Sequence, residues 1–150
     1  MRTQSRARHA STVYNATLTL SLVALALVGC ATNKLPKVAT CLDDSSGCIS
    51  QRQATLNTML ADPNRAWVGK TPTPVVYATG VRLFAWRKSK SDLSCGELKS
   101  GIAETGGART TLAENIPGAS KTRIGQIIAL SDDVNRELKR TARGKRCPKS

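Results

Sequence analysis

The segment SKTRIGQIIALSDDVNRELKRTA, residues 120–142, carries the clearest structural pattern in this sequence. Its large aliphatic residues recur at intervals of three, four and seven, which is the repeat of one face of an α-helix. Ser120 precedes the pattern, where its hydroxyl can cap the first turn. The segment therefore predicts a helix over residues 120–142 whose buried face is formed by Ile124, Ile127, Ile128, Val134 and Leu138.

Two segments nearer the N-terminus also favour helices. In residues 48–61 the apolar side chains fall near one helical face, namely Ile49, Leu56, Met59 and Leu60. Residues 75–88 fit a helix that begins near Pro74, because proline is well suited to the first helical turn. Gly80 lies inside this second helix and weakens it by about 1 kcal/mol.

A fourth helix is indicated by Ser94 and Glu97, which have the spacing of a capping box. This helix would turn Leu98 and Ile102 inward and end near residues 106–107. No internal repeat is evident. The sequence predicts an all-α fold, a small domain of about four helices over residues 41–150.

The first thirty residues have the composition of an export signal. Three arginines occur there without any acidic residue, and the apolar run LTLSLVALALVGC follows at residues 18–30. The uncharged run over residues 16–29 is shorter than the ~20 residues that a membrane-spanning helix needs. We therefore expect residues 1–29 to be a cleaved signal peptide, with an uncleaved anchor as the alternative.

The run ends in Leu27-Val28-Gly29-Cys30, which resembles the lipobox of bacterial lipoproteins. The resemblance implies cleavage before Cys30, lipidation of its thiol and acylation, for instance with palmitate, of the new N-terminus. Such a protein is held to the membrane stably because each buried CH₂ of its acyl chains contributes ~0.8 kcal/mol. Residues 30–40 would then form the lipidated N-terminus and a short tether.

The residue after the lipidated cysteine influences sorting in such lipoproteins. Here it is Ala31, and not the aspartate that in many double-membraned bacteria retains lipoproteins at the inner membrane. The resemblance thus implies attachment to the outer membrane, with the domain facing the periplasm. The outer leaflet of the inner membrane and the cell surface stay open as alternatives.

The chain is strongly basic. Removing residues 1–29 takes away three arginines and no acidic residue, which lowers the formal net charge from +13 to +10. This charge favours acidic partners, such as lipopolysaccharide, anionic phospholipid headgroups or an acidic cell-wall polymer like peptidoglycan. Because the chain is exported, we expect no nucleic-acid partner.

Four cysteines remain after residue 30: Cys41, Cys48, Cys95 and Cys147. An even count in an exported chain indicates two disulfides. A Cys₄ zinc site is the alternative, but zinc ligands usually occur in pairs two to four residues apart, and no such pair exists here. We slightly favour the pairing of Cys41 with Cys48 and of Cys95 with Cys147, and the two other connectivities stay open.

The sequence contains few of the residues that catalytic or metal sites need. The only histidine, His9, lies in the signal, so we predict no catalytic residues, no metal site and no cofactor. The stretch Gly69-Lys70-Thr71 resembles the end of a phosphate-binding loop, but Asn64 stands where the loop needs glycine, and Pro72 opposes the helix that should follow. We expect a turn there.

Two groups of residues allow a functional and a structural interpretation. The acid pairs at residues 43–44 and 132–133 are adjacent in sequence, which is more typical of a solvated surface than of carboxylates that face each other across a cleft. The large aromatics are Trp67, Tyr77, Phe84 and Trp86. We favour core packing for these aromatics. The alternative is a surface that binds sugar rings or, around Trp67 and Trp86, another protein.

The densest charge feature is the basic run at the C-terminus, formed by Lys139, Arg140, Arg143, Lys145, Arg146 and Lys149. Positive residues there complement the negative end of a helix. They also suit the phosphates or carboxylates of a polyanion. The two interpretations have equal support.

Together these features predict a membrane-anchored envelope lipoprotein that is not an enzyme. Its expected role is binding or structural, with an anionic envelope polymer as the favoured ligand. An accessory subunit of an envelope secretion, transport or assembly complex is the alternative. The sequence leaves the oligomeric state open.

Overall fold

The structure, a computed structural model, describes residues 38–113 and 115–148. These residues form six helices and no β-strand, so the all-α prediction is confirmed. The helices are α1 (Ser46–Ala61), α2 (Pro74–Ala78), α3 (Val81–Ser89), α4 (Cys95–Gly106), α5 (Ala108–Thr111) and α6 (Lys121–Gly144). The predicted signal peptide, Cys30 and Lys149 lie outside the described residues.

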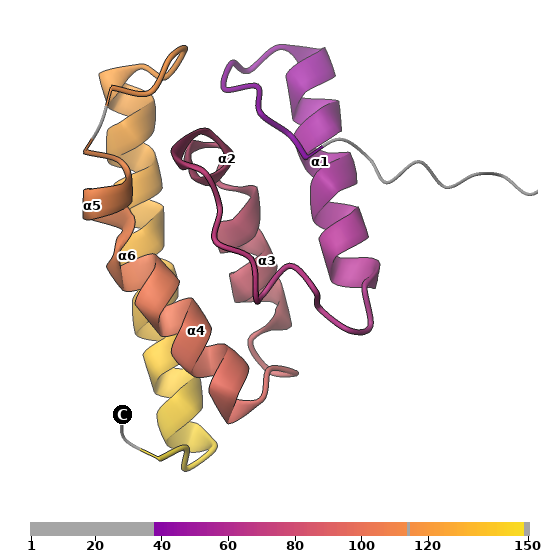
Figure 1. Cartoon of the computed structure of the whole chain (residues 1–150), viewed down its shortest axis with the longest axis vertical. Helices are drawn as coiled ribbons and strands as arrows, with labels where there is room; N and C mark the ends of the chain where they lie inside the picture. Colours follow the sequence, from indigo (N-terminus) through magenta and orange to yellow (C-terminus); the bar gives the residue numbers. More distant parts are fainter. Residues whose placement is uncertain (1–37, 114, 149–150) are drawn as a thin grey trace, which may run out of the picture. The chain divides into compact units, whose positions relative to one another are not determined.

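The long C-terminal helix organises the domain. In Figure 1, α4 runs along α6, and α3 lies between α6 and α1. Ser120 caps α6 as predicted, because its hydroxyl accepts a hydrogen bond from the backbone N–H of Arg123 at 3.1 Å. The capping box of α4 is also confirmed, with Ser94 and Glu97 bonded to each other's backbone amides. Local sequence therefore sets where both helices begin.

The single helix predicted over residues 75–88 is wrong. The chain forms two helices, α2 and α3, and Gly80 lies between them in the left-handed conformation with φ of 78°. This conformation strains residues that carry a Cβ. A Cβ built on Gly80 would also lie 2.9 Å from Cδ1 of Ile127 on α6, so a larger residue would have to displace the end of that side chain as well as adopt the strained backbone.

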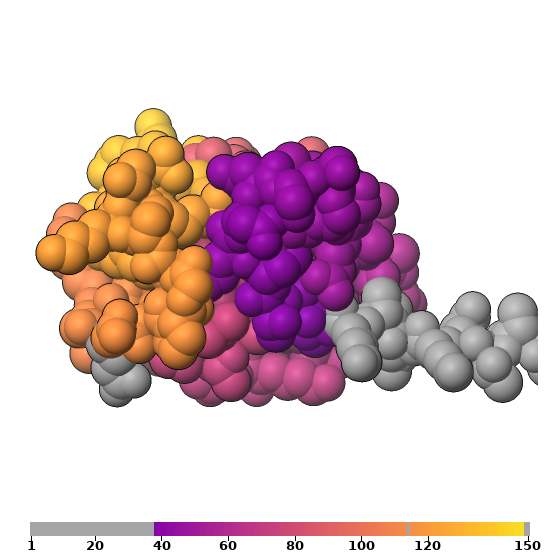
Figure 2. Space-filling model, turned by 90° about the horizontal axis from the view of Figure 1, so that it is seen from above, coloured from indigo at the N-terminus to yellow at the C-terminus, as the bar shows by residue number. Residues whose placement is uncertain are grey.

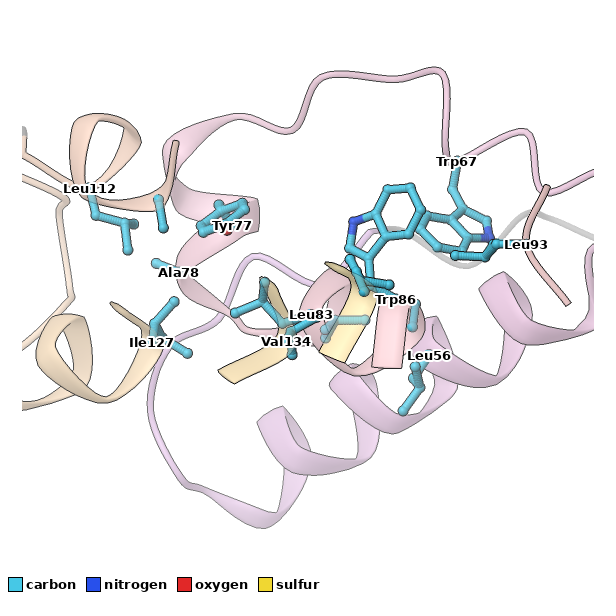
Figure 3. Close-up of a cluster of buried hydrophobic side chains, with 14 of the residues drawn as sticks. Leu56, Trp67, Tyr77, Ala78, Leu83, Trp86, Leu93, Leu112, Ile127 and Val134 are labelled. Carbon is cyan, nitrogen blue, oxygen red and sulfur yellow. The ribbon is translucent and has the colours of Figure 1, made fainter. Parts of the chain in front are cut away.

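The core lies where α3, α4 and α6 meet. Figure 3 shows Leu83 beside Val134 and the Trp86 indole directed toward Trp67, and Leu83, Trp86 and Val134 are each fully buried. On α6 the predicted face is confirmed: Ile127, Val134 and Leu138 are buried, and Ile124 and Ile128 are partly buried.

The buried face predicted for α1 is partly wrong. Leu56 is buried as expected, but Ile49 keeps 50% of its accessible surface and Leu60 keeps 38%. Cys48 and Thr55 are buried on this helix instead of Ile49 and Leu60. Because α1 contacts mainly one other helix, α3, only a narrow stripe of the α1 surface is buried.

A chain of buried polar groups joins α2, α4 and α6. The hydroxyls of Tyr77 and Ser131 lie 2.7 Å apart, and the Ser131 hydroxyl donates to the backbone oxygen of Thr105. The amide of Asn135 donates to the Thr105 hydroxyl at 2.8 Å. Because buried polar groups are costly without partners, these bonds favour one relative placement of the three helices.

The start of the domain packs against the start of α6. Figure 2 shows the surface of the residues around the beginning of α1 against the surface of the residues that open α6. Asp44 and Arg123 lie 3.6 Å apart across this contact. Ala39 is buried, and its N–H donates to the Thr55 hydroxyl. The packed part of the chain therefore begins at least two residues before the boundary expected at residue 41.

Candidate functional site

Four cationic side chains of α6 line one surface groove. Arg136, Lys139, Arg140 and Arg143 line a shallow, open hollow of about 260 Å³, which we call the α6 groove. Their spacing of three, four and seven residues brings them to one side of the helix. The buried residues of α6, including Val134 and Leu138, lie on the opposite side. The core-facing residues thus fix the helix and leave these cations in solvent.

The α6 groove has little compensating negative charge. Arg136 pairs with Asp133 one turn earlier on the helix. Within the described part of the chain, Lys139, Arg140 and Arg143 make no ion pair. Three neighbouring cations without partners repel one another, and an anion bound among them would relieve that repulsion.

A second acid of the same helix, Glu137, is engaged elsewhere. Its carboxylate lies 2.7 Å from Nζ of Lys90 and 3.0 Å from the Arg87 guanidinium, both contributed by the segment around the end of α3. The hydrogen bond from Lys90 lowers the pKa of Glu137, with Arg87 and Arg140 acting in the same direction. Glu137 therefore joins α6 to α3, and it does not line the α6 groove.

Lys145 and Arg146 of the predicted basic run do not line the α6 groove. Lys145 donates to the backbone oxygen of Leu93 at 2.8 Å, which ties the end of α6 to the segment before α4. Arg146 follows in the left-handed conformation, with φ of 56°, and is exposed. Arg136 was absent from the predicted run because that run was chosen by density in sequence. Helical spacing would have found it.

Comparisons with protein-family models, with curated proteins and with solved structures found no match to this chain. The function of the site therefore has to follow from the chemistry of its own residues. Among residues 38–113 and 115–148, no helix combines the length and the apolar character needed to cross a bilayer.

The four cysteines form two disulfides, in the connectivity that the sequence slightly favoured. Cys41 pairs with Cys48, and Cys95 pairs with Cys147, with Cα atoms 5.7 and 5.5 Å apart. The second bond joins the start of α4 to the residues after α6, so it holds the end of the helix that carries the α6 groove. Because the sulfurs are bonded to each other, they cannot serve as the four thiolate ligands of a zinc site.

Core packing is confirmed for three of the four large aromatics. Trp67 and Trp86 meet with ring centroids 4.7 Å apart at an interplanar angle of 69°. Figure 3 shows the two indoles side by side, and both are buried, as is Tyr77. The two tryptophans therefore form no exposed recognition surface. Phe84 differs, because it keeps 43% of its accessible surface although its helical spacing from Tyr77 predicted burial. The turn at Gly80 separates these two residues into different helices.

The acid pairs interact with arginines and with the backbone. Asp43 accepts a hydrogen bond from the N–H of Ser45, and Asp44 pairs with Arg52. Asp132 pairs with Arg109, and Asp133 with Arg136 as described above. All four carboxylates are accounted for by these local contacts.

A second hollow lies at the turn formed by Gly69-Lys70-Thr71. This turn is present as predicted, and no helix follows it directly. Together with residues of α4 and α5 it lines a pocket of about 370 Å³, which we call the turn pocket. The turn pocket shares no lining residue with the α6 groove.

Proposed function

We propose that this chain is a membrane-anchored envelope lipoprotein with a non-enzymatic binding role, and that its ligand is an anionic polymer of the envelope. The observation that carries the proposal is the α6 groove, which is lined entirely by cations. Three of its four lining residues are arginines, whose planar guanidinium groups bind phosphate or carboxylate with two parallel hydrogen bonds. Phosphorylated lipopolysaccharide and the carboxylates of peptidoglycan both present such groups.

Stabilisation of the helix C-terminus by positive charge explains few of the cations that line the α6 groove. A helix dipole favours cations within the last turn, and its effect decays beyond it. Arg143 lies in the last turn of α6, but Arg136, Lys139 and Arg140 precede that turn. Three of the four cations therefore have no role in stabilising the helix end, which supports a role in ligand binding.

A charge-matched pair of variants tests the ligand. The first replaces Lys139, Arg140 and Arg143 with glutamine. The control replaces Lys88, Lys99 and Lys121, three exposed lysines outside the α6 groove, so both variants lose the same net charge. We expect the first variant alone to lose affinity for purified lipopolysaccharide or peptidoglycan, by at least about tenfold, in a salt-sensitive sedimentation assay. Equal retention of the two variants would contradict the proposal.

The membrane anchor has its own test. We expect mass spectrometry of the membrane-bound protein to show a chain that begins at Cys30 and carries acyl groups. A chain that retains residues 1–29 and a free thiol at Cys30 would contradict lipidation. That result would not bear on ligand binding by the α6 groove, which the sedimentation experiment tests separately.

A further inference from the structure

The turn pocket differs in chemistry from the α6 groove. One wall is the turn at residues 68–72, the opposite wall is the exposed side of α4 with Ser100, Ala103 and Glu104, and Thr111 of α5 contributes at one side. Its volume of about 370 Å³ lies in the range of small-molecule sites, which run from roughly 300 to 1,000 Å³.

The wall formed by the turn is held in place before any ligand arrives. Arg65 binds Glu97 of α4 at 2.7 Å, and the indole N–H of Trp67 donates to the backbone oxygen of Met59. The backbone oxygen of Trp67 accepts a hydrogen bond from the Arg82 guanidinium at 2.8 Å. Because three bonds fix the segment just before the turn, a ligand would not have to order it, and this favours binding.

Glu104 gives the pocket an oriented and neutralised carboxylate. Arg82, which is nearly fully buried, donates to both of its oxygens, at 2.8 Å from Nε to Oε1 and through Nη2 to Oε2. Each carboxylate oxygen can accept more than one hydrogen bond. The pair therefore carries no net charge but retains acceptor capacity for hydroxyl groups.

The remaining lining alternates hydroxyl groups with apolar surface. The lining residues with hydroxyls free of the buried polar chain are Thr71, Ser100 and Thr111, and apolar surface is offered by Val68, Pro72, Ala103 and the ring of Tyr77. Among the described residues that line the pocket, Lys70 alone carries a charge that no ion pair neutralises. A phosphate would face one cation beside a carboxylate, and an ammonium ion would face Lys70 and a carboxylate already paired with Arg82, so neither ion is well matched.

We propose that the turn pocket binds one sugar residue of a neutral glycan. A sugar presents hydroxyl groups that both donate and accept hydrogen bonds, and its ring carries apolar C–H faces. The hydroxyls and the Glu104 carboxylate match the first feature, and the aliphatic side chains of the turn and of α4 match the second. This site is independent of the anion-binding function proposed for the α6 groove.

The test uses the ¹⁵N-labelled full-length protein with two neutral probes, the tetramers of N-acetylglucosamine and of glucose. We expect at least one to shift the amide signals of residues 69–71 and Thr111 saturably, with a dissociation constant of about 1 mM. Ala103→Trp fills the pocket from an exposed position on α4 and should weaken binding at least about tenfold. Ala129→Trp, the same change at an exposed position of α6 outside the pocket, should leave affinity unchanged.

Three results would overturn the sugar site. They are the absence of saturable shifts with both tetramers, equal affinity in Ala103→Trp and wild type, and stronger shifts of the same amides with inorganic phosphate or glycine. If Ala103→Trp does not fold, Ser100→Trp fills the pocket from the same helix face. Loss of lipopolysaccharide binding in the α6 variant with unchanged sugar binding would show that the two sites are separate.

Discussion

Gly101 of α4 lies directly against the indole of Trp86 on α3. A Cβ built on Gly101 would be 2.9 Å from Cε3 of Trp86 and 2.9 Å from Cδ1 of Leu138 on α6. Both neighbours are fully buried, so neither has space to move away. Glycine at this position lets three helices approach one another at the centre of the core.

Replacing Gly101 with alanine should therefore destabilise the domain. Overpacking of this kind costs about 1–3 kcal/mol, which outweighs the gain in helix propensity. Gly125→Ala on α6 is the control, because no atom lies within 4 Å of its built Cβ, and it should stabilise the domain by about 0.5–1 kcal/mol. Urea unfolding of both variants measures the difference, and equal stabilities would contradict the packing.

Acid should weaken the domain partly through Glu97. The hydrogen bond from Arg65, followed by that from the backbone N–H of Ser94, lowers the pKa of Glu97 to about 2 from its ordinary 4.5. The unfolded chain takes up the proton at higher pH, so the stabilisation is complete above about pH 5 and is lost as pH falls toward 2. The Glu97 side chain keeps 21% of its accessible surface, and solvent screening leaves a contribution on the order of 1 kcal/mol.

Glu97→Gln provides the comparison, since glutamine also suits the capping box. We expect its free energy of unfolding to fall less than that of the wild type between about pH 6 and about pH 3. The same loss in both proteins would show that Glu97 does not contribute to the acid sensitivity.

Tyr77 should resist ionisation until the domain opens. Burial raises its pKa to about 12 from 10.0, although the hydrogen bond with Ser131 acts in the opposite direction. Since the raised pKa belongs to the folded state, the stability that Tyr77 contributes is complete below pH 10 and is lost as pH rises toward 12. A chain that begins at residue 31 has Tyr77 as its single tyrosine, so tyrosinate absorbance reports this residue alone. A midpoint near pH 10 without unfolding would contradict its burial.

The two disulfides should contribute unequally to stability. Cys95 and Cys147 are 52 residues apart in sequence, whereas Cys41 and Cys48 are 7 apart. Cross-linking distant residues restricts the unfolded chain more, which corresponds to about 4 kcal/mol for the long loop and ~2.5 kcal/mol for the short one. Thermal unfolding of the two double serine variants compares them, and a larger loss for Cys41→Ser with Cys48→Ser would reverse the expected order.

Features set by neighbouring residues could be predicted from the sequence. The caps at Ser94 and Ser120 depend on groups three residues away, and both formed as expected. The buried face of α6 also depends on residues three or four positions apart, so its helical repeat predicted it. Pro74 also opens a helix as predicted, with Thr73 as its cap.

Features set by contacts between helices could not be predicted. Gly80 makes its left-handed turn against Ile127, which lies 47 residues later in the sequence. The sequence does not pair Arg82 with Glu104, yet they form a largely buried ion pair whose carboxylate lines the turn pocket. The α6 groove differs from these features, because its four cations lie on one predicted helix and their helical spacing alone would have brought Arg136 beside the later cations.

The division of α6 into an apolar side and a cationic side has an evolutionary consequence. Substitutions among the groove residues would change the charge of this surface without touching the side chains that pack α6 against α3 and α4. On the proposed function, a lineage carrying this domain could exchange one acidic partner for another by such surface substitutions alone. Its members would share an architecture while differing in specificity.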